Sequence, residues 1–357
     1  MQKNNRLFFL DYLRIFAFIS VLIGHKFQNT ITSLSNDQSL HAIISDSFYL
    51  LSKFTEFGGA GVVVFFMVSG YIISASTRES SASSFLIKRF FRIYPLYIFA
   101  VFLEIAFIYI STGNIKTSFT DLIATITLTG DIFNTPYALS GVEWTLRVEI
   151  LFYFLIAFAQ RIKLLENGKN TVYAMISIAV FMNFFPIPDA EGWATGYTSI
   201  YMPFIFIGVC FYIYENKQEI NISHLIAYTS MLYAIHLISL SENNPALKNS
   251  YFSAIAVAIF TLAWIFRNYF SHSRISLIIS SLTYSVYLFH NWIWEYLYSF
   301  SNNLITPPWA VSLSTVILLF FICFLFHILI EKPFIKLGKY MTKKNFTSEK
   351  SASYALS

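Results

Sequence analysis

Apolar residues in this chain occur in long blocks separated by short polar segments. Most blocks hold about 17–22 residues, the length that a helix needs to cross the hydrocarbon core of a bilayer. The alternating pattern of a membrane β-barrel is absent from the sequence. We therefore predict an all-α polytopic integral membrane protein with about ten transmembrane helices, at 7–25, 58–76, 94–112, 145–160, 172–186, 198–214, 223–240, 251–267, 277–298 and 311–330.

The composition agrees with a membrane location. Of the 357 residues, 56% are hydrophobic and only 12% are charged, whereas soluble domains have about 25% charged residues. Lys3 and Arg6 precede the first block, as in a secretory signal peptide. Asp11 and Arg14 interrupt that block, however, and no small-residue cleavage site follows it. We expect the first block to be a retained span.

Lysines and arginines are unequally divided between the two sides of the predicted spans. With the N-terminus inside, eighteen lie in inner segments, and only Lys26, Lys53, Lys116 and Lys248 lie in outer loops. The positive-inside rule then predicts that both termini are cytoplasmic. Because the net charge of +5 follows this topology, it does not indicate a nucleic-acid partner.

Two regions are expected: a transmembrane domain over 1–335 and a short basic cytoplasmic tail over 336–357, with no soluble domain. The longest outer loop, 26–57, has apolar residues at helical spacing. It is either an amphipathic helix at the outer interface or an ordinary packed loop. The segment 118–133 is apolar but short and rich in threonine, which favours a re-entrant or interfacial position.

The first block, LFFLDYLRIFAFISVLIGH, carries the most informative polar residues. Arg14 and His25 are eleven positions apart, so on a helix they project from nearly the same face, about 16 Å apart along the axis. An ionisable group at membrane depth costs roughly 2.5–3.5 kcal/mol, which favours a lined pocket over a lipid-facing position. Asp11 lies one turn before Arg14 and can neutralise it. Arg14 is then either an anion-binding residue at the bottom of a pocket, or a structural ion pair or snorkelling side chain.

A second candidate, Glu149, lies in the block GVEWTLRVEILFYFL, which enters the membrane from the outer side near Trp144. Its expected depth is comparable with that of His25. A carboxylate beside an imidazole fixes the tautomer and raises the basicity, as a general base requires. The alternative is a buried hydrogen bond that only holds two helices together. Arg147 is a candidate partner of Glu149 and would weaken it as a proton acceptor.

A basic cluster stands at the inner edge of the third span, in FLIKRFFRIYPLY. Arg89 and Arg92 are three positions apart and share a helix face, where two guanidinium groups can grip phosphates. Lys88 adds a third positive charge. The alternative is that positive-inside anchoring alone places these residues at the membrane edge.

Small residues mark the second block, GGAGVVVFFMVSGYIIS. Gly58, Gly59 and Gly61 are expected to let helices pack closely, as small residues do in membranes. Ser69 can instead hydrogen-bond a ligand or the backbone one turn away, and Tyr71 beside it is a further pocket candidate.

The remaining histidines and the cysteines give weaker signals. His290 lies in the outer half of the ninth span and is a pocket candidate, whereas His236 and His327 are expected to be packing residues. No two histidines on one helix have metal-site spacing with a carboxylate partner, so no metal is predicted. Cys210 and Cys323 fall in apolar spans and are expected to pack without a disulfide framework.

Six blocks, taken in order, resemble the membrane acyltransferase-3 family. They are LDYLR with His25 following after ten residues, FFMVSGYII, KRFFRIYP, EWTLRVEILFY, TYSVYLFH and EKP at 331–333. Each block is weak alone, but together they cover nearly the whole chain. The resemblance implies that 1–335 is an acyltransferase-3-like domain in a bacterial inner membrane.

Members of this family acylate cell-surface glycans and related acceptors. The resemblance implies an acyl-CoA donor, usually acetyl-CoA, reached from the cytoplasm, and a glycan or glycolipid hydroxyl as the acceptor at the outer face. It implies essential roles for Arg14 and His25, a catalytic role for Glu149, and contacts of Arg89 and Arg92 with the CoA phosphates. Some members carry a fused extracytoplasmic hydrolase-like domain. We expect none here, so the chain either acts alone or hands its acyl group to a separate periplasmic partner.

These features predict a membrane O-acyltransferase, most simply an O-acetyltransferase that modifies a surface polysaccharide. His25 is the expected general base, oriented by Glu149, and a covalent acyl-histidine intermediate is the alternative. The rival classes are a glycan or lipid transporter and a polysaccharide polymerase. A transporter would show Gly/Pro-interrupted spans in two related halves, which the sequence lacks. A purely structural scaffold is disfavoured by Arg14 at membrane depth.

Overall fold

The computed structural model describes most of the chain, namely residues 7–78, 80–115, 117–189, 194–217, 219–247, 251–271 and 273–355. All regular structure in these ranges is helical. Four residues that entered the count of charges lie outside the described ranges: Lys3, Arg6, Lys116 and Lys248.

The helices form two compact units. The first unit consists of Met1–Ala75 and Leu165–Tyr287, and the second of Ser76–Leu164 and Leu288–Ser357. Each unit is therefore built from two stretches that are far apart in the sequence.

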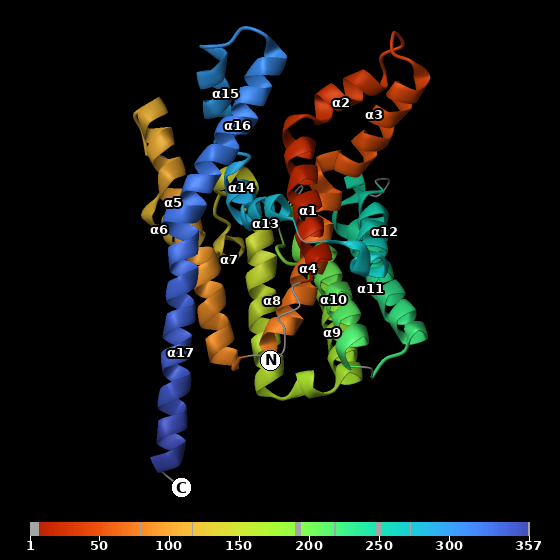
Figure 1. Cartoon of the computed structure of the whole chain (residues 1–357), viewed down its shortest axis with the longest axis vertical. Coiled ribbons are helices and arrows are strands. Elements are labelled where there is room, and N and C mark those ends of the chain that lie inside the picture. Colours follow the sequence, from red (N-terminus) through yellow and green to blue (C-terminus); the bar gives the residue numbers. More distant parts are fainter. Residues whose placement is uncertain are drawn as a thin grey trace. The chain divides into compact units, whose positions relative to one another are not determined.

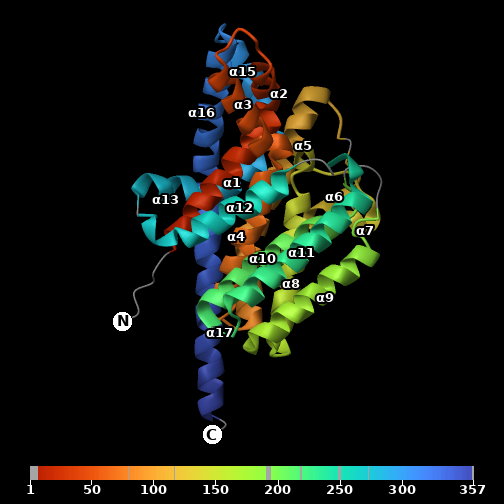
Figure 2. The same cartoon turned by 90° about the vertical axis from the view of Figure 1, so that its right-hand side faces the viewer.

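The first unit is centred on one buried helix. Its helices are α1 (Phe8–Lys26), α2 (Gln28–Ser35), α3 (Ala42–Thr55), nearly all of α4 (Gly59–Thr77), α9 (Gly168–Phe184), α10 (Tyr197–Lys217), α11 (Ile222–Asn243), α12 (Phe252–Ile265) and α13 (Arg274–Ser281). α10 packs against both α9 and α11, and Figure 2 shows the three side by side. In the most apolar 18-residue stretch of α10, 94% of the residues are buried. This helix therefore forms the core of the unit.

Glycines allow two helices to approach α4 closely. A Cβ atom at Gly61 would lie 2.3 Å from the carbonyl oxygen of Ala17 in α1, and one at Gly59 would lie 2.8 Å from the ring of Phe252 in α12. Any larger residue would therefore push these helices apart. The expectation of close packing at these small residues is confirmed.

The second unit is built around α5. It contains α5 (Ala82–Thr112), α6 (Phe119–Ile126), α7 (Gly130–Phe133), α8 (Trp144–Arg161), α15 (Trp294–Asn302), α16 (Pro308–Phe326) and α17 (Lys332–Ala355), and α14 (Thr283–Phe289) joins the two units in sequence. α5 packs against α8 and α17. The Ser81 hydroxyl, which accepts from the Ser84 N–H, starts α5, and Gly113 in the left-handed conformation ends it.

A single long helix runs through α16 and α17 (Figure 1). The two are joined by a π-helical turn, His327–Glu331, in which the Lys332 N–H donates to the carbonyl of His327. The turn ends two residues before Pro333, whose missing N–H and bulky ring would disturb a regular α-helix. The region expected to be a tail after residue 335 continues as helix to Ala355.

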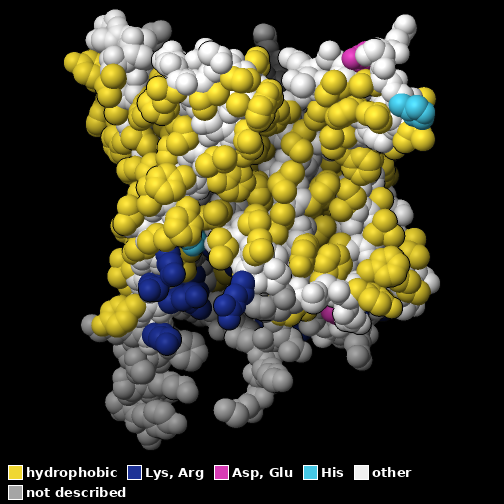
Figure 3. Space-filling model, turned by 45° about the horizontal axis from the view of Figure 1, so that its top comes forward, with side chains coloured by type: hydrophobic (Ala, Val, Ile, Leu, Met, Phe, Trp, Pro, Cys, Tyr) yellow, Lys and Arg dark blue, Asp and Glu magenta, His cyan; other side chains and the backbone are white. Residues whose placement is uncertain are grey.

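Six helices of the described chain are long and apolar enough to cross a membrane: α1, α4, α5, α10, α11 and the combined α16–α17. The face shown in Figure 3 is largely hydrophobic, with lysine and arginine side chains gathered at its lower left. The expected spans 145–160, 172–186 and 251–267 are helices, but they fall outside this set. The total of ten spans and the sidedness of the termini remain predictions.

The expected span 277–298 is wrong as a single helix. It breaks into α13, α14 and α15, with turns at Leu282 and between His290 and Ile293. Polar Ser, Thr, His and Asn side chains in this stretch can bond to the backbone locally, which favours such breaks.

The two segments with alternative interpretations are both helical. The loop 26–57 forms the helices α2 and α3, which pack against each other, and apolar side chains such as Ile43 and Leu50 are exposed on α3. The segment 118–133 forms the short helices α6 and α7. At eight and four residues, neither is long enough to span a bilayer.

Candidate active site

The candidate residues fall in both units. The first unit holds Asp11, Arg14, His25, Ser69 and Tyr71. The second unit holds Lys88, Arg89, Arg92, Trp144, Glu149 and His290.

His25 lies at the C-terminal end of α1, and its side chain is exposed. A Cβ atom at Gly58 would lie 3.4 Å from Cδ2 and 3.5 Å from Nε2 of the imidazole. Gly58 has a φ of +68°, which favours glycine, so the turn that brings the backbone beside the imidazole depends on this residue. An exposed imidazole at a helix end can be reached by a substrate.

Arg14 takes part in an ion pair on its own helix. Its Nη1 lies 3.6 Å from Oδ1 of Asp11, and the Ser280 hydroxyl donates to the same oxygen at 2.7 Å. This pairing of Arg14 with Asp11 was one of the two expected possibilities. The Arg14 side chain is 26% exposed, so it also remains accessible to an anion.

Glu149 and Arg89 meet at one tyrosine that the sequence did not single out. The Tyr153 hydroxyl donates to Oε1 of Glu149 at 2.6 Å. The guanidinium carbon of Arg89 lies 5.5 Å from the Tyr153 ring centroid and 5.3 Å from that of Phe85. One of its nitrogens, Nη2, donates to the Ser76 hydroxyl oxygen at 2.8 Å. Tyr153 therefore links the candidate catalytic carboxylate to the basic cluster.

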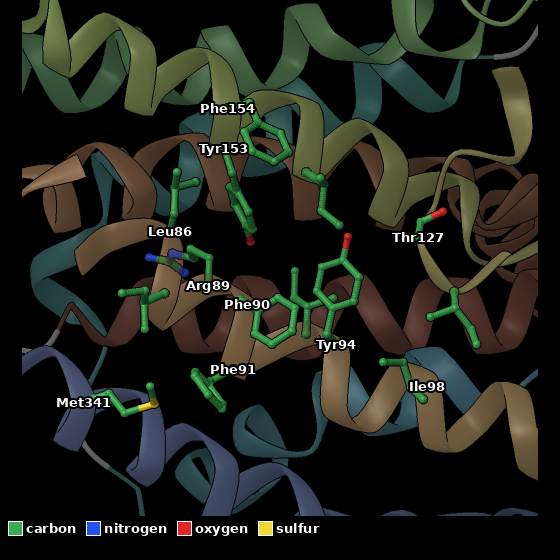
Figure 4. Close-up of a pocket in the computed structure, with 14 residues that line it drawn as sticks. Leu86, Arg89, Phe90, Phe91, Tyr94, Ile98, Thr127, Tyr153, Phe154 and Met341 are labelled. Atoms are coloured by element: carbon green, nitrogen blue, oxygen red, sulfur yellow. The ribbon is translucent and has the colours of Figure 1, made fainter. Parts of the chain in front are cut away.

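Arg89 and Tyr153 also line a pocket of about 630 Å³ in the second unit. Most of its wall is apolar and comes from α5 and α8, with Ile126 and Thr127 at the end of α6 and Met341 from α17. In Figure 4 the Arg89 guanidinium stands at one end, beside Tyr153, and Ile98 and Thr127 stand toward the other. The pocket thus combines a cation at one end with a long apolar surface.

Arg92 belongs to a different network. Its Nη1 lies 3.8 Å from Oε1 of Glu331, while Nδ1 of His327 is 2.8 Å from the other oxygen of that carboxylate. Glu331 is buried at the π-helical turn, whereas the Arg92 side chain is 38% exposed. His327, expected to be a packing residue, instead contacts a carboxylate. Lys88 is half-buried on α5.

A buried ionic cluster surrounds Arg147. Its guanidinium pairs with Asp131 and, at 2.6 Å, with Oε1 of Glu143. The Tyr137 ring centroid lies 4.6 Å from the same guanidinium. Burial raises the pKa of Glu143 to about 8, and Arg147 acts in the opposite direction.

This arrangement differs from the expected pairing of Arg147 with Glu149. The structure gives Arg147 ion pairs with Asp131 and Glu143, and gives Glu149 the Tyr153 hydroxyl. Residues two apart on a helix do not face each other, whereas Glu143 lies one full turn before Arg147. The weakening of Glu149 by Arg147 stays a prediction.

The other pocket candidates are buried or half-buried. Ser69 is buried in α4, and the Tyr71 hydroxyl donates to Oε2 of Glu215 at 2.8 Å. Trp144 begins α8 and is half-buried, and His290 is buried in the turn between α14 and α15. The contact with Glu215 favours a structural role for Tyr71.

Both cysteines are buried. Cys210 and Cys323 are buried free thiols, which confirms them as packing residues. Within the described ranges, no group of three His, Cys, Asp or Glu side chains is placed to hold a metal ion.

A comparison with known families decides the class of protein. Residues 7–328 match the family model for an acyltransferase domain, Acyl_transf_3. The chain belongs to the acyltransferase-3 family. The match confirms the resemblance seen in the sequence, and five of the six blocks lie inside the matched residues. The EKP block at 331–333, which includes the Glu331 that contacts Arg92, lies just beyond them.

Two curated relatives of this acyltransferase-3 protein are similar over part of their length. Over 178 residues it is 31% identical to nodulation protein 10 of Rhizobium leguminosarum bv. viciae, which covers 43% of each chain. Over 189 residues it is 26% identical to an O-acetyl transferase of Shigella phage Sf6, which covers 49% of this chain and 51% of the relative. The chain thus spans about half the length of the curated relatives it matches. No solved structure matches it.

Proposed function

We propose that this acyltransferase-3 protein is an O-acyltransferase that moves an acyl group from acyl-CoA to a hydroxyl of a glycan or glycolipid. The match of residues 7–328 to the acyltransferase family carries this proposal. Similarity to the O-acetyl transferase of phage Sf6 over about half its length supports acetyl as the simplest acyl group. Acetyl-CoA is then the donor, reached from the cytoplasm, and the acceptor lies at the outer face of a bacterial inner membrane.

In this reaction His25 is the general base. Its imidazole takes the proton of the acceptor hydroxyl, the oxygen attacks the thioester carbonyl, and the C–S bond breaks to release CoA, which is protonated as it leaves. The exposed position of His25 at the end of α1 supports this role. A covalent acyl-histidine is the alternative course. Arg14 is proposed as a second essential residue because it is accessible to an anion.

Glu149 is proposed to orient and charge-stabilise the imidazole. Glu149 is buried and accepts a short hydrogen bond from the Tyr153 hydroxyl. Both features would hold its carboxylate in one position, which supports this role. Because Glu149 and His25 belong to different units, their pairing is a proposal that functional measurements must test.

Arg89, Arg92 and Lys88 are the proposed contacts of the CoA phosphates. Arg92 is 38% exposed and its contact with Glu331 is long, which leaves the guanidinium available to a phosphate. Arg92→Ala should therefore raise the KM for acetyl-CoA more than it lowers kcat. An unchanged KM would mean that Arg92 does not bind the donor and only anchors α5 at the inner edge of the membrane.

The test uses membranes that hold wild-type protein or His25→Ala, supplied with acetyl-CoA labelled in the acetyl group. Label should enter alkali-labile ester on extracted glycan with the wild type, and His25→Ala should lower that rate by about 10²–10⁴-fold at a similar protein level. Persistent transfer by the variant would remove His25 from the centre of the mechanism.

The rival proposal is a glycan or lipid transporter or a polysaccharide polymerase. A polymerase would use lipid-linked sugar and be indifferent to acyl-CoA. Binding of acetyl-CoA to the detergent-purified protein separates the two, because a missing acceptor would abolish transfer but not donor binding. Whether the chain acts alone or through a separate acyl-carrying partner is tested by repeating the transfer with purified protein.

A further inference from the structure

The short helix α13 turns its polar side toward the protein and its apolar side outward. Ser276 and Ser280 are buried. Ile275 is 69% exposed and Ile278 is 53% exposed. α13 packs against α1, and Figure 2 shows the two helices side by side. Because a buried hydroxyl needs a hydrogen-bond partner, the inner face of α13 is expected to serve a polar group of the first unit.

The two buried serines of α13 use their hydroxyl groups differently. The Ser276 hydroxyl donates to the carbonyl of Ser273, at the start of the same helix, at 2.9 Å. The Ser280 hydroxyl donates to Oδ1 of Asp11 in α1 at 2.7 Å. Asp11 is only 3% exposed. Ser280 therefore joins α13 to a buried carboxylate, whereas Ser276 serves its own helix.

The break after α13 fixes the position of Ser280. In a continuous helix, the Ser280 carbonyl would accept from the backbone N–H four residues later. Instead, α13 ends at Ser281, and the Thr283 hydroxyl donates to the Ser280 carbonyl at 2.7 Å. Both the backbone and the side chain of Ser280 are thus held by hydrogen bonds.

The oxygen of Asp11 that Ser280 contacts is also the one that faces Arg14. Nη1 of Arg14 lies 3.6 Å from Oδ1 of Asp11, which is longer than the roughly 2.7–2.9 Å of a charge-assisted hydrogen bond. The Arg14 side chain is 26% exposed. A hydroxyl that donates to the carboxylate lowers its need for a close guanidinium, so Arg14 can stay near Asp11 and still be reached by an anion.

We propose that Ser280 is a positioning residue for Arg14. Its hydroxyl shares the Asp11 carboxylate with Arg14 and thereby keeps the guanidinium accessible to an anionic group of the substrate. Without the hydroxyl, the buried carboxylate would draw Arg14 into a closer ion pair. The consequence for catalysis rests on the proposed acyl transfer, in which acetyl-CoA is the anionic substrate.

The first test measures how fast phenylglyoxal, an arginine reagent, modifies Arg14 in the full-length protein purified in detergent. Peptide mass spectrometry gives the rate at Arg14, with the exposed Arg161 as internal reference. Ser280→Ala should slow the modification of Arg14 roughly three- to tenfold, the effect of one hydrogen bond. Ser280→Thr keeps a hydroxyl and should restore part of the rate. A rate in Ser280→Ala that equals or exceeds that of the wild type would overturn the proposal.

Ser276→Ala is the matched control, because it removes a buried hydroxyl one turn earlier on the same helix. Arg14 should be modified in it as fast as in the wild type. Equal slowing by Ser276→Ala and Ser280→Ala would mean that any change on the inner face of α13 disturbs Arg14, and Ser280 would then have no role of its own. In an Asp11→Asn background, Ser280→Ala should change the rate no further, since Ser280 acts through the carboxylate.

Steady-state kinetics test the consequence for the reaction. Ser280→Ala should raise the KM for acetyl-CoA roughly three- to tenfold and leave kcat within about twofold. A loss of folded protein would instead lower the apparent kcat and leave KM unchanged. Slower modification of Arg14 with an unchanged KM would show that Arg14 does not meet the donor, against the proposal. Modification needs no turnover, so a wild type without acetyl transfer would refute the proposed function while the rates at Arg14 still decide the role of Ser280.

Discussion

At the scale of residues, Tyr153 is the contact on which Glu149 depends. Tyr153→Phe removes the 2.6 Å hydrogen bond to the carboxylate but keeps the ring beside Arg89. A hydrogen bond to a charged group is worth about 1.5–3 kcal/mol. If Glu149 must be held in place for transfer, kcat should fall roughly ten- to hundredfold, with little change in the KM for acetyl-CoA. Steady-state kinetics in proteoliposomes provide the measurement.

Tyr94→Phe is the matched control for this prediction. Tyr94 lines the same pocket as Tyr153, but it lies on α5, whereas Glu149 lies on α8. Tyr94→Phe also removes one hydroxyl from the pocket wall. Equal effects of the two substitutions would mean that the pocket, and not the Glu149 contact, limits the rate.

The proposed pairing of His25 with Glu149 also belongs to the residue scale. If the carboxylate acts only through the imidazole, Glu149→Gln should cost nothing further once His25 has been replaced by Ala. The double variant should then match His25→Ala in rate, because residues that act as a unit are strongly non-additive. A double variant whose loss equals the product of the single losses would show that the two residues act independently.

Sequence reasoning found some of these residues and missed others for a physical reason. Glu149 could be identified because a charge at membrane depth is costly and stands out. Arg89 could be identified because it belongs to a compact basic cluster at the inner edge of a predicted span. Tyr153 could not, since it is one of 23 tyrosines in a chain that is 19% aromatic. Its only signal is its position four residues after Glu149, on the same helix face. The pocket is likewise invisible in sequence because distant segments form its wall.

At the scale of elements, the ionic cluster of Arg147 connects α8 to the segment before it. Arg147→Ala would leave the carboxyl groups of Glu143 and Asp131 little exposed and without their guanidinium. Loss of one partner from a buried ion pair typically costs about 3–5 kcal/mol. Arg147→Ala should therefore lower the midpoint of thermal unfolding in detergent clearly below that of the wild type.

Arg161→Ala is the control, because Arg161 lies at the opposite end of the same helix and is exposed. Its midpoint should stay near that of the wild type. Equal midpoints for Arg147→Ala and Arg161→Ala would show that the buried cluster contributes no net stability.

The ends of a helix were predictable where the apolar block ends within one residue of the helix, as in α1 and α4. They were not predictable where polar residues continue a helix or break it. The third span was expected to begin at residue 94, but α5 begins at Ala82, because the basic residues lower local hydropathy without disturbing the helix. The ninth span was expected to be continuous, but 277–298 contains no glycine or proline to mark its breaks.

At the scale of the whole molecule, hydropathy predicts an α-helical membrane protein more firmly than it predicts the number and direction of the spans. The described chain is helical, and six of its helices meet the length and composition of a membrane span. α8 has 18 residues but carries Arg147, Glu149 and Arg161, so it is not among the six. Whether α8 crosses the membrane determines which side each later segment lies on.

Cysteine labelling can settle both the crossing of α8 and the orientation. The native thiols Cys210 and Cys323 are fully buried, so they should contribute little background labelling. Asn114 and Lys163 are exposed and lie in the chain before and after α8. Asn114→Cys and Lys163→Cys provide one reporter on each side of the helix.

With both termini in the cytoplasm, a membrane-impermeant maleimide should label Asn114→Cys in intact spheroplasts, where the outer face of the inner membrane is accessible. It should label Lys163→Cys only after the membrane is permeabilised. The reverse pattern would invert the orientation predicted from the positive-inside rule. Labelling of both positions from the same side would mean that α8 does not span the bilayer, and the predicted depth of Glu149 below the outer surface would then be wrong.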